Sequence, residues 1–316
     1  LRTELGAVLG AAAFNRYPDP RAPALKARMR AAFGIPDSLG LMLGNGSDEI
    51  IQIIAMALAR PGAALLAVEP SFVMYRMIAG FCGMRYVGVP LRADFSLDAE
   101  AVLTAIETQR PALVFLAYPN NPTGNAFGRA EIERIITATP GLVVIDEAYH
   151  AFAGGLSYLG ELARHDNVVL MRTVSKLGLA GLRLGYLVGA PRWLDEFDKL
   201  RLPYNINVLT QCAAELALVH LDTLEAQAQS IVAERGRVAE CLAGLPGVTV
   251  YPSQANFLLF RVTDAAKVFT GLKARGVLIK NLHGAHPLLG DCLRVTVGAP
   301  AENEAFLTAL SAELGV

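Results

Sequence analysis

The sequence has few cysteines, and no short motif gathers the residue types that bind metal ions. Its four cysteines and five histidines are scattered along 316 residues, with no CxxC pair. Metal sites usually show such residues at short, regular spacings, so we predict no metal site. Scattered cysteines also argue against a disulfide framework and favour reduced thiols, as in the cytoplasm.

The sequence also lacks an excess of either charge and any long apolar segment. Its 28 Lys and Arg residues nearly balance 29 Asp and Glu, which gives a net charge of −1 at pH 7. A nucleic-acid-binding surface needs a basic excess. No apolar run reaches the ~18 residues of a membrane span, and the chain does not open on a signal-peptide pattern. Neither a nucleic acid nor a membrane is therefore expected as a partner.

Short apolar runs, in contrast, are abundant, and 53% of the residues are hydrophobic. Strands of mostly Val, Ile and Leu are expected at residues 64–68, 85–89, 113–118, 142–146, 168–171 and 184–188. Helical patterns lie around them, at residues 22–33, 50–59, 72–81, 97–108, 129–137 and 193–202. Solid apolar runs are typical of strands buried on both faces. Their alternation with helices predicts an α/β fold with a mostly parallel sheet flanked by helices.

The pattern changes after the sequence GLPG at residues 244–247. Two long helices, at residues 208–220 and 223–242, lead away from the predicted sheet. A smaller α+β domain follows, with strands at residues 248–251, 257–261, 277–280 and 293–297 and helices at 265–275 and 302–314. The predicted division is a remnant of an N-terminal arm at 1–14, a large domain at 15–225 and a small C-terminal domain at 226–316.

The most informative stretch is MRTVSKLGLAGLRLGY at residues 171–186, where a buried strand leads to Ser175 and Lys176. A lysine that loses solvation has a lowered pKa, which frees a nucleophilic amine. Ser175, Arg183 and the intervening glycines suit a bulky anion. A reactive amine beside an anion site fits pyridoxal phosphate (PLP). The alternative interpretation is a solvated lysine at a strand end, followed by a basic turn.

Polar residues also follow two other predicted strands. Asp146 ends the apolar run LVVID, where its carboxylate needs a partner such as a protonated pyridine nitrogen. Tyr149 and Asn121 can each donate a hydrogen bond to an oxygen on such a ring. The alternatives are a helix cap for Asp146, a core position for Tyr149 and an ordinary turn for Asn121.

Four further residues can bind the ends or the face of a flat, phosphorylated ligand. Ser47 and Asp48 open a helix whose free N–H groups can bind phosphate. Phe72 can stack on a ring, and Arg294, which interrupts an apolar strand, can bind an anion through two hydrogen bonds. An ordinary helix cap, core packing and an exposed edge arginine are the alternatives. A nucleotide-binding α/β protein that uses residues 44–48 for phosphate also remains open at this point.

The order of three motifs, YPNNPTG, VVIDEAY and SKLGLAGLRLG, resembles the fold-type-I PLP-dependent aminotransferases. Flanking motifs resemble the histidinol-phosphate aminotransferase branch, so that the resemblance covers residues 15–316: NRYPDP, GNGSDE, EPSFVMY, RLPYNIN, SQANFLLF and DCLRVTVG. The resemblance implies a cytoplasmic homodimer that acts in histidine biosynthesis on small molecules. It would convert L-histidinol phosphate and 2-oxoglutarate to imidazole-acetol phosphate and L-glutamate.

The resemblance also implies a role for each candidate residue. Lys176 would bind the cofactor covalently and move protons, Asp146 would pair with the pyridine nitrogen, and Tyr149 and Asn121 would hold the 3-oxygen. Phe72 would stack on the ring. The groups implied for the cofactor phosphate are Ser175, Arg183, the backbone at Ser47 and Asp48, and Tyr17 of the neighbouring subunit. The groups implied for the substrate are Arg294, Lys280, Asn121 and Tyr17.

Two departures from the family pattern and several related enzymes qualify this hypothesis. The Asn-Glu-Asn-Pro-type segment that normally covers the site is absent, so the chain is expected to be incomplete there. Lys280-Asn281 replaces the Arg-Asp of many relatives, and lysine offers a point charge in place of a fork. An aromatic-amino-acid aminotransferase and a threonine-phosphate decarboxylase would share Lys176, Asp146 and Arg183. A PLP-binding regulator would need a DNA-binding module, for which too few residues precede Asn15.

Overall fold

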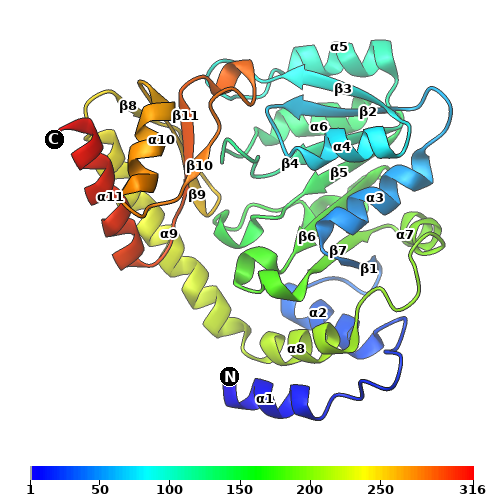
Figure 1. Cartoon of the computed structure of the whole chain (residues 1–316). Coiled ribbons are helices and arrows are strands. Elements are labelled where there is room, and N and C mark those ends of the chain that lie inside the picture. Colours follow the sequence, from blue (N-terminus) through cyan, green and yellow to red (C-terminus); the bar gives the residue numbers. More distant parts are fainter. Residues whose placement is uncertain (1) are drawn as a thin grey trace.

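The computed structural model describes residues 2–316 and contains two β-sheets (Figure 1). The larger sheet has seven strands, which in spatial order are β1 (Gly40–Asn45), β7 (Leu184–Gly189), β6 (Val168–Thr173), β5 (Leu142–Asp146), β4 (Leu113–Ala117), β2 (Ala64–Glu69) and β3 (Arg85–Pro90). Neighbours from β3 to β6 are parallel, and β7 is antiparallel to both β6 and β1. The prediction of a mostly parallel sheet is therefore confirmed.

Helices cover both faces of this sheet and enclose two apolar cores. The helices on one face are α2 (Pro23–Phe33), α5 (Ala99–Gln109), α6 (Arg129–Ala138) and α8 (Val208–Val219). Those on the other face are α3 (Ser47–Leu58), α4 (Met74–Phe81) and α7 (Pro191–Asp198). Buried side chains of these helices, such as Leu25 of α2, Ile53 of α3 and Ile132 of α6, belong to the two cores, which bury the strands from both sides. The α/β architecture follows from this double burial.

Two elements of the larger sheet differ from the sequence prediction. The patterns do not predict β1, because Gly40 and Gly44 reduce its apolar run to residues 41–43. Pairing with β7 over six residues makes it a strand nevertheless. Helix α7 ends at Asp198, four residues before the predicted end at residue 202.

The smaller sheet is antiparallel and packs against three helices. Its strands are β10 (Lys280–Asn281), β11 (Cys292–Thr296), β9 (Phe257–Val262) and β8 (Val248–Val250), and the helices are α9 (Leu221–Ala243), α10 (Ala265–Ala274) and α11 (Pro300–Leu314). The expected strand at 277–280 is wrong except at its last residue, because Leu278 is 75% exposed and only Lys280 and Asn281 pair with β11. In Figure 1 this unit lies beside the carboxyl ends of the parallel strands.

Helix α9 extends from α8 to the smaller sheet (Figure 1) and contains the boundary expected between residues 225 and 226. We propose that the two sheets mark a large domain at 15–225 and a small domain at 226–316, joined through α9. The N-terminal helix α1 (Arg2–Gly10) packs against α8. None of the helices in the described part of the chain combines the length and hydrophobicity that a bilayer-spanning helix requires.

Candidate active site

The carboxyl ends of β4, β5 and β6 meet at a cavity of about 120 Å³. Nine of the ten candidate cofactor contacts line this cavity: Ser47, Asp48, Phe72, Asn121, Asp146, Tyr149, Ser175, Lys176 and Arg183. The tenth, Tyr17, does not line it. The convergence follows from topology, because neighbouring parallel strands end at the same edge of a sheet.

Lys176 lies in the single 3₁₀ turn Ser175–Leu177, directly after β6. Its Nζ lies 5.5 Å from the centre of the Tyr149 ring. Burial lowers the pKa of Lys176, the positive charge of Arg294 lowers it further, and the negative charge of Asp146 opposes both. A lowered pKa increases the fraction of neutral amine, which is the nucleophilic form.

Asp146 ends β5 and is 4% exposed. Burial raises the pKa of its carboxyl to about 6, against the effect of two hydrogen bonds. The Tyr75 hydroxyl donates to Oδ2 at 2.6 Å, and the Ala148 N–H donates to Oδ1 at 3.0 Å. A buried carboxylate held in this way is suited to pair with a cationic ring nitrogen. Tyr75 was not predicted as a site residue, because the motif EPSFVMY carries no local sign of a partner 71 residues away.

Tyr149 and Asn121 lie on the side of the cavity toward the smaller sheet. Burial raises the pKa of Tyr149 to about 12, so its phenol stays protonated at neutral pH and can donate. Its ring packs edge-on against Phe257, at 5.2 Å between centres. Asn121 Oδ1 accepts a short hydrogen bond from Arg294 Nη1. Both side chains therefore connect the cavity to residues of β9 and β11.

Arg294 of β11 is a half-buried cation that contacts Asn121 of the cavity, so the alternative of an exposed edge arginine is wrong. Its guanidinium carbon lies 4.7 Å from the centre of the Phe257 ring, and its buried Nε finds no hydrogen-bond partner among the described residues. Lys280 faces Arg294 across the β10–β11 pair, so both side chains project from the same face of the sheet. Lys280 itself is exposed.

The other end of the cavity is formed by the start of α3, with Ser47 and Asp48 in its first turn. Arg183 reaches Asp48 at 3.2 Å, and Thr173, which the sequence analysis missed, donates from its hydroxyl to the Ser175 hydroxyl at 2.8 Å. A Cβ at Gly185 would lie 2.6 Å from the backbone of Gly46, so glycine is needed for β7 to approach this turn. Free helix N–H groups, a hydroxyl and a guanidinium together suit a phosphate.

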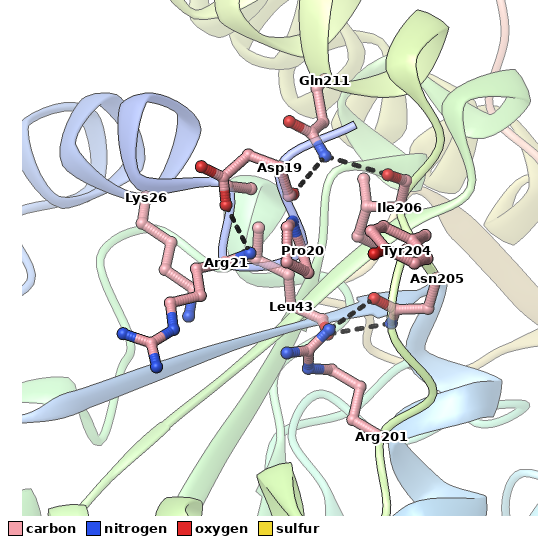
Figure 2. A pocket seen from close by; sticks show the side chains of 11 residues that line it. Asp19, Pro20, Arg21, Lys26, Leu43, Arg201, Tyr204, Asn205, Ile206 and Gln211 are labelled. Atoms are coloured by element: carbon pink, nitrogen blue, oxygen red, sulfur yellow. Dashed lines mark hydrogen bonds between the residues drawn. The ribbon is translucent and has the colours of Figure 1, made fainter. Parts of the chain in front are cut away.

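A second set of polar contacts supports the start of α3 from behind (Figure 2). Asn205 donates to the Leu43 carbonyl at 3.3 Å and to Glu49 Oε2 at 2.7 Å. The same Glu49 oxygen accepts from the Asn45 N–H at 2.6 Å. In Figure 2, Arg201 donates to the Asn205 side chain. Contacts from the RLPYNIN segment therefore hold the turn between β1 and α3. The pocket drawn in Figure 2 beside this segment has a volume of only about 10 Å³.

Tyr17 lies outside the cavity of its own chain. It is 81% exposed, and its ring stacks on Tyr204 at 4.5 Å between centres. Phe72, by contrast, lies at the cavity and meets Tyr75 edge-on at 5.6 Å.

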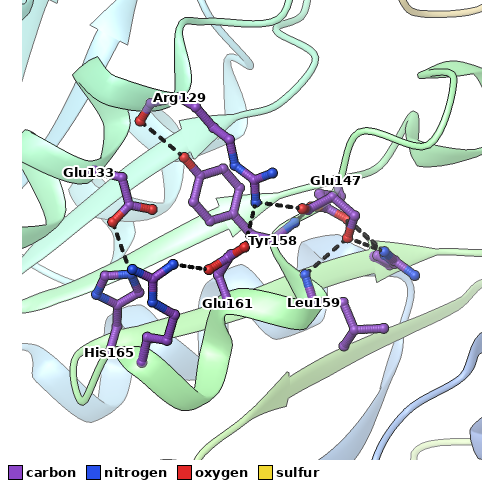
Figure 3. A network of polar contacts seen from close by, with 10 residues as sticks. Arg129, Glu133, Glu147, Tyr158, Leu159, Glu161 and His165 are labelled. Carbon is purple, nitrogen blue, oxygen red and sulfur yellow. Dashed lines mark hydrogen bonds and ion pairs between the residues drawn. The ribbon is translucent and has the colours of Figure 1, made fainter.

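A buried ion pair supports the turn that carries Asp146 and Tyr149. Glu147 is fully buried, and its Oε2 accepts from Arg172 Nε at 2.9 Å and Nη2 at 2.8 Å. Its other oxygen accepts from the Tyr158 N–H at 2.6 Å, as Figure 3 shows within a larger polar network. This pair was not predicted, because 25 residues separate its members and no short motif joins them.

We expect the substitution Glu147→Leu to lower the free energy of unfolding by about 3–5 kcal/mol, because it leaves the buried Arg172 cation unpaired. Urea denaturation of the cofactor-free protein measures the loss. Glu161→Gln is the control: the Arg164 partner of Glu161 is 71% exposed, and such a pair contributes at most about 1 kcal/mol. Equal stability of the two variants would contradict the structural role assigned to Glu147.

The comparisons with known proteins agree with this fold. The family model "Aminotransferase class I and II" matches residues 8–310. The chain is 56% identical over 310 residues to a histidinol-phosphate aminotransferase of Chromobacterium violaceum, covering 98% of this chain and 87% of that protein. It is also 56% identical over 315 residues to histidinol-phosphate aminotransferase 1 of Burkholderia lata, covering 99% and 88%.

A solved structure extends the likeness to three dimensions. It is the histidinol-phosphate aminotransferase of Sinorhizobium meliloti in complex with pyridoxal-5'-phosphate, with a TM-score of 0.90 and 27% identity over 99% of this chain and 86% of that one. The chain therefore belongs to the class I and II aminotransferases, and its near relatives carry the name histidinol-phosphate aminotransferase. The predicted family and fold class are confirmed, and the nucleotide-binding alternative is wrong.

Proposed function

We propose that this chain uses PLP to transfer the amino group of L-histidinol phosphate to 2-oxoglutarate, as a step of histidine biosynthesis in the cytoplasm. One observation carries the proposal: Lys176 and Asp146 line the same cavity, whose end is an anion cradle. The names and the 56% identity of the relatives favour this substrate over others on the same fold.

The groups around the cavity fit PLP by their chemistry. A buried carboxylate suits the pyridine nitrogen, a protonated phenol and an amide suit the ring oxygen, and the α3 start with Arg183 suits the phosphate. The groups proposed to hold the cofactor are Ser47, Asp48, Phe72, Asn121, Asp146, Tyr149, Ser175, Lys176 and Arg183. When bound, PLP supplies an electron sink that withdraws charge from the substrate α-carbon.

The reactive residue of the chain is Lys176, whose amine would hold the cofactor and would be released when the substrate amine takes its place. The free Nζ would then take the proton from the substrate α-carbon and deliver it to the cofactor within the same half-reaction, and the second half-reaction would run this transfer in reverse. Asp146 holds a proton on the ring nitrogen through its negative charge. Tyr149 stays protonated and donates to the ring oxygen, because burial raises its pKa to about 12.

The substrate anion is proposed to bind at Arg294. Its guanidinium is half-buried and keeps an Nε donor unused among the described residues, while Nη1 holds Asn121. Such a donor can bind either the carboxylate of 2-oxoglutarate or the phosphate of histidinol phosphate. Lys280, on the same face of the sheet, adds a point charge that attracts the same anions.

A homodimer is part of the proposal, because Tyr17 lies outside the cavity of its own chain and is 81% exposed. Its phenol would reach the phosphate and the substrate in the site of a second subunit.

A half-reaction tests the proposed function. L-Histidinol phosphate is added to the PLP-loaded protein without a keto acid, and the absorption spectrum is followed. We expect the spectrum of pyridoxamine phosphate to appear, and 2-oxoglutarate then to restore the first spectrum with formation of glutamate. Faster conversion by L-phenylalanine would favour an aromatic-amino-acid aminotransferase, and release of carbon dioxide from threonine phosphate would favour a decarboxylase. No response to histidinol phosphate would overturn the proposal.

A further inference from the structure

Tyr75 is a fully buried residue of α4 that does not line the cavity, yet it contacts the most buried charged group of the site. Its hydroxyl donates to Asp146 Oδ2 at 2.6 Å, across 71 residues of sequence. The second carboxylate oxygen is engaged by the Ala148 N–H. These two donors, on opposite oxygens, fix the plane of the carboxylate.

The ring of Tyr75 is itself held on two sides. It stacks on Phe115 of β4 with ring centres 4.5 Å apart and an angle of 12° between planes. Its edge meets Phe72 at 5.6 Å and 86°. Because the tyrosine ring cannot move independently of these neighbours, its hydroxyl presents a fixed donor to Asp146. One side chain therefore contacts both the residue proposed for the ring nitrogen and the residue proposed for the ring face.

The hydroxyl also matters for the charge of Asp146. A carboxyl that loses its water on burial favours the neutral form, and a hydrogen-bond donor favours the anion. Burial dominates at Asp146, and the Tyr75 hydroxyl is the largest of the effects that oppose it. Hydrogen bonds to a charged group are about twice as strong as those between neutral groups. Removal of this donor leaves one backbone N–H to hold a buried anion.

We propose that Tyr75 is a positioning residue, whose hydroxyl holds the Asp146 carboxylate in the orientation and charge state that the cofactor ring requires. The proposal rests on the proposed use of PLP and on no choice of substrate. Tyr75 acts through Asp146 and touches neither the substrate nor the reacting atoms.

The variant Tyr75→Phe tests this directly, because it keeps both ring contacts and removes only the donor. We expect the dissociation constant of PLP, measured by titration of the cofactor-free protein, to rise about tenfold or more, since a hydrogen bond to a charged group contributes roughly 1.5–3 kcal/mol. We also expect kcat to fall more than KM changes, and the pH titration of the bound cofactor's absorption band to shift.

Tyr158→Phe is the matched control. Tyr158 is equally buried, and its hydroxyl donates a long hydrogen bond of 3.4 Å to the Arg129 carbonyl, away from the cavity. The PLP affinity of the Tyr158→Phe variant should stay within about twofold of that of the original protein, because the hydrogen bond it loses is neutral and lies outside the site. A urea denaturation curve of each cofactor-free variant shows whether the variant is folded.

A double-mutant cycle separates positioning from a general packing effect. If Tyr75 acts through Asp146, the effect of Tyr75→Phe on PLP affinity should disappear in an Asp146→Ala background, where no acceptor is left for the Tyr75 hydroxyl. An equal effect in both backgrounds, or unchanged PLP affinity and pH titration in Tyr75→Phe alone, would overturn the inference. These measurements use no amino donor, so a wrong substrate in the proposed function would leave them interpretable.

Discussion

Replacement of Lys176 by alanine is expected to reduce turnover of histidinol phosphate by at least about 10⁴-fold. The change removes both the nucleophile that attaches the cofactor and the group that moves the α-carbon proton, and proton transfer alone typically contributes 10²–10⁴-fold. Lys176 is not part of an apolar core, so the fold should persist. Steady-state assays give the loss of rate. Borohydride reduction followed by mass measurement should find a cofactor adduct on the original protein and none on the variant.

Lys199→Ala is the control for this experiment. Lys199 lies at the end of α7, is 65% exposed and pairs with Glu196 of the same helix. Its removal should leave both the rate and the adduct unchanged. A Lys176→Ala protein that kept a tenth of the activity, or that still formed the adduct after reduction, would show that another amine is the reactive one.

Asp146→Asn is expected to lower kcat/KM by about 10²–10³-fold, the range found when one preorganised electrostatic group is removed from a catalytic site. The amide is nearly the same shape and can still accept from Tyr75, but it carries no charge to hold a proton on the ring nitrogen. Asp166→Asn serves as a control, since Asp166 is 91% exposed and lies outside the cavity. Near-normal activity of the Asp146 variant would contradict the assignment.

In the cofactor-free protein, Asp146→Asn should have the opposite effect on stability: it should raise the free energy of unfolding. Burial raises the pKa of Asp146 from 3.8 to about 6, so between these values the folded protein keeps the proton while the unfolded chain releases it. Stability then falls as pH rises through this window and stays reduced above it.

At pH 8 the Asn variant should therefore be more stable than the original cofactor-free protein by about 3 kcal/mol, since each unit of pKa shift corresponds to about 1.4 kcal/mol. Near pH 4 this difference should largely vanish. Urea denaturation at the two pH values measures it. Equal stability at pH 8 would mean that Asp146 carries no unpaired buried charge.

The sequence predicts the apolar strands and the polar residues at their ends better than the residues that support them through distant contacts, and the reason is physical. Strands such as β4 and β5 are solid apolar runs, and a polar residue at the end of such a run is a local signal that needs no knowledge of the partner. Lys176 and Asp146 are found in this way, and the sheet topology then brings them to one cavity. Strand β1 escapes because its glycines remove the local signal, and pairing with β7 supplies the stabilisation instead.

The residues that the sequence analysis missed act through distant partners. Tyr75 contacts Asp146, and Glu147 pairs with Arg172, in each case across a separation that no periodicity reveals. The functional roles of Lys280 and Tyr17 stay predictions. Lys280 shares a face with Arg294 by strand register, and Tyr17 lies outside the cavity of its own chain.

The two ends of the cavity differ in what forms them: backbone contacts at one end and a long side chain at the other. At the α3 end, glycine positions such as Gly185 allow backbone to touch backbone, so the shape there leaves little room for variation. At the other end, Arg294 of the smaller sheet contacts Asn121 through its long side chain. The residues proposed to recognise the substrate can therefore vary while the turn proposed to hold the cofactor phosphate stays fixed. Engineering of the amino-donor specificity should begin with residues of β10 and β11, and should keep glycines such as Gly185 unchanged.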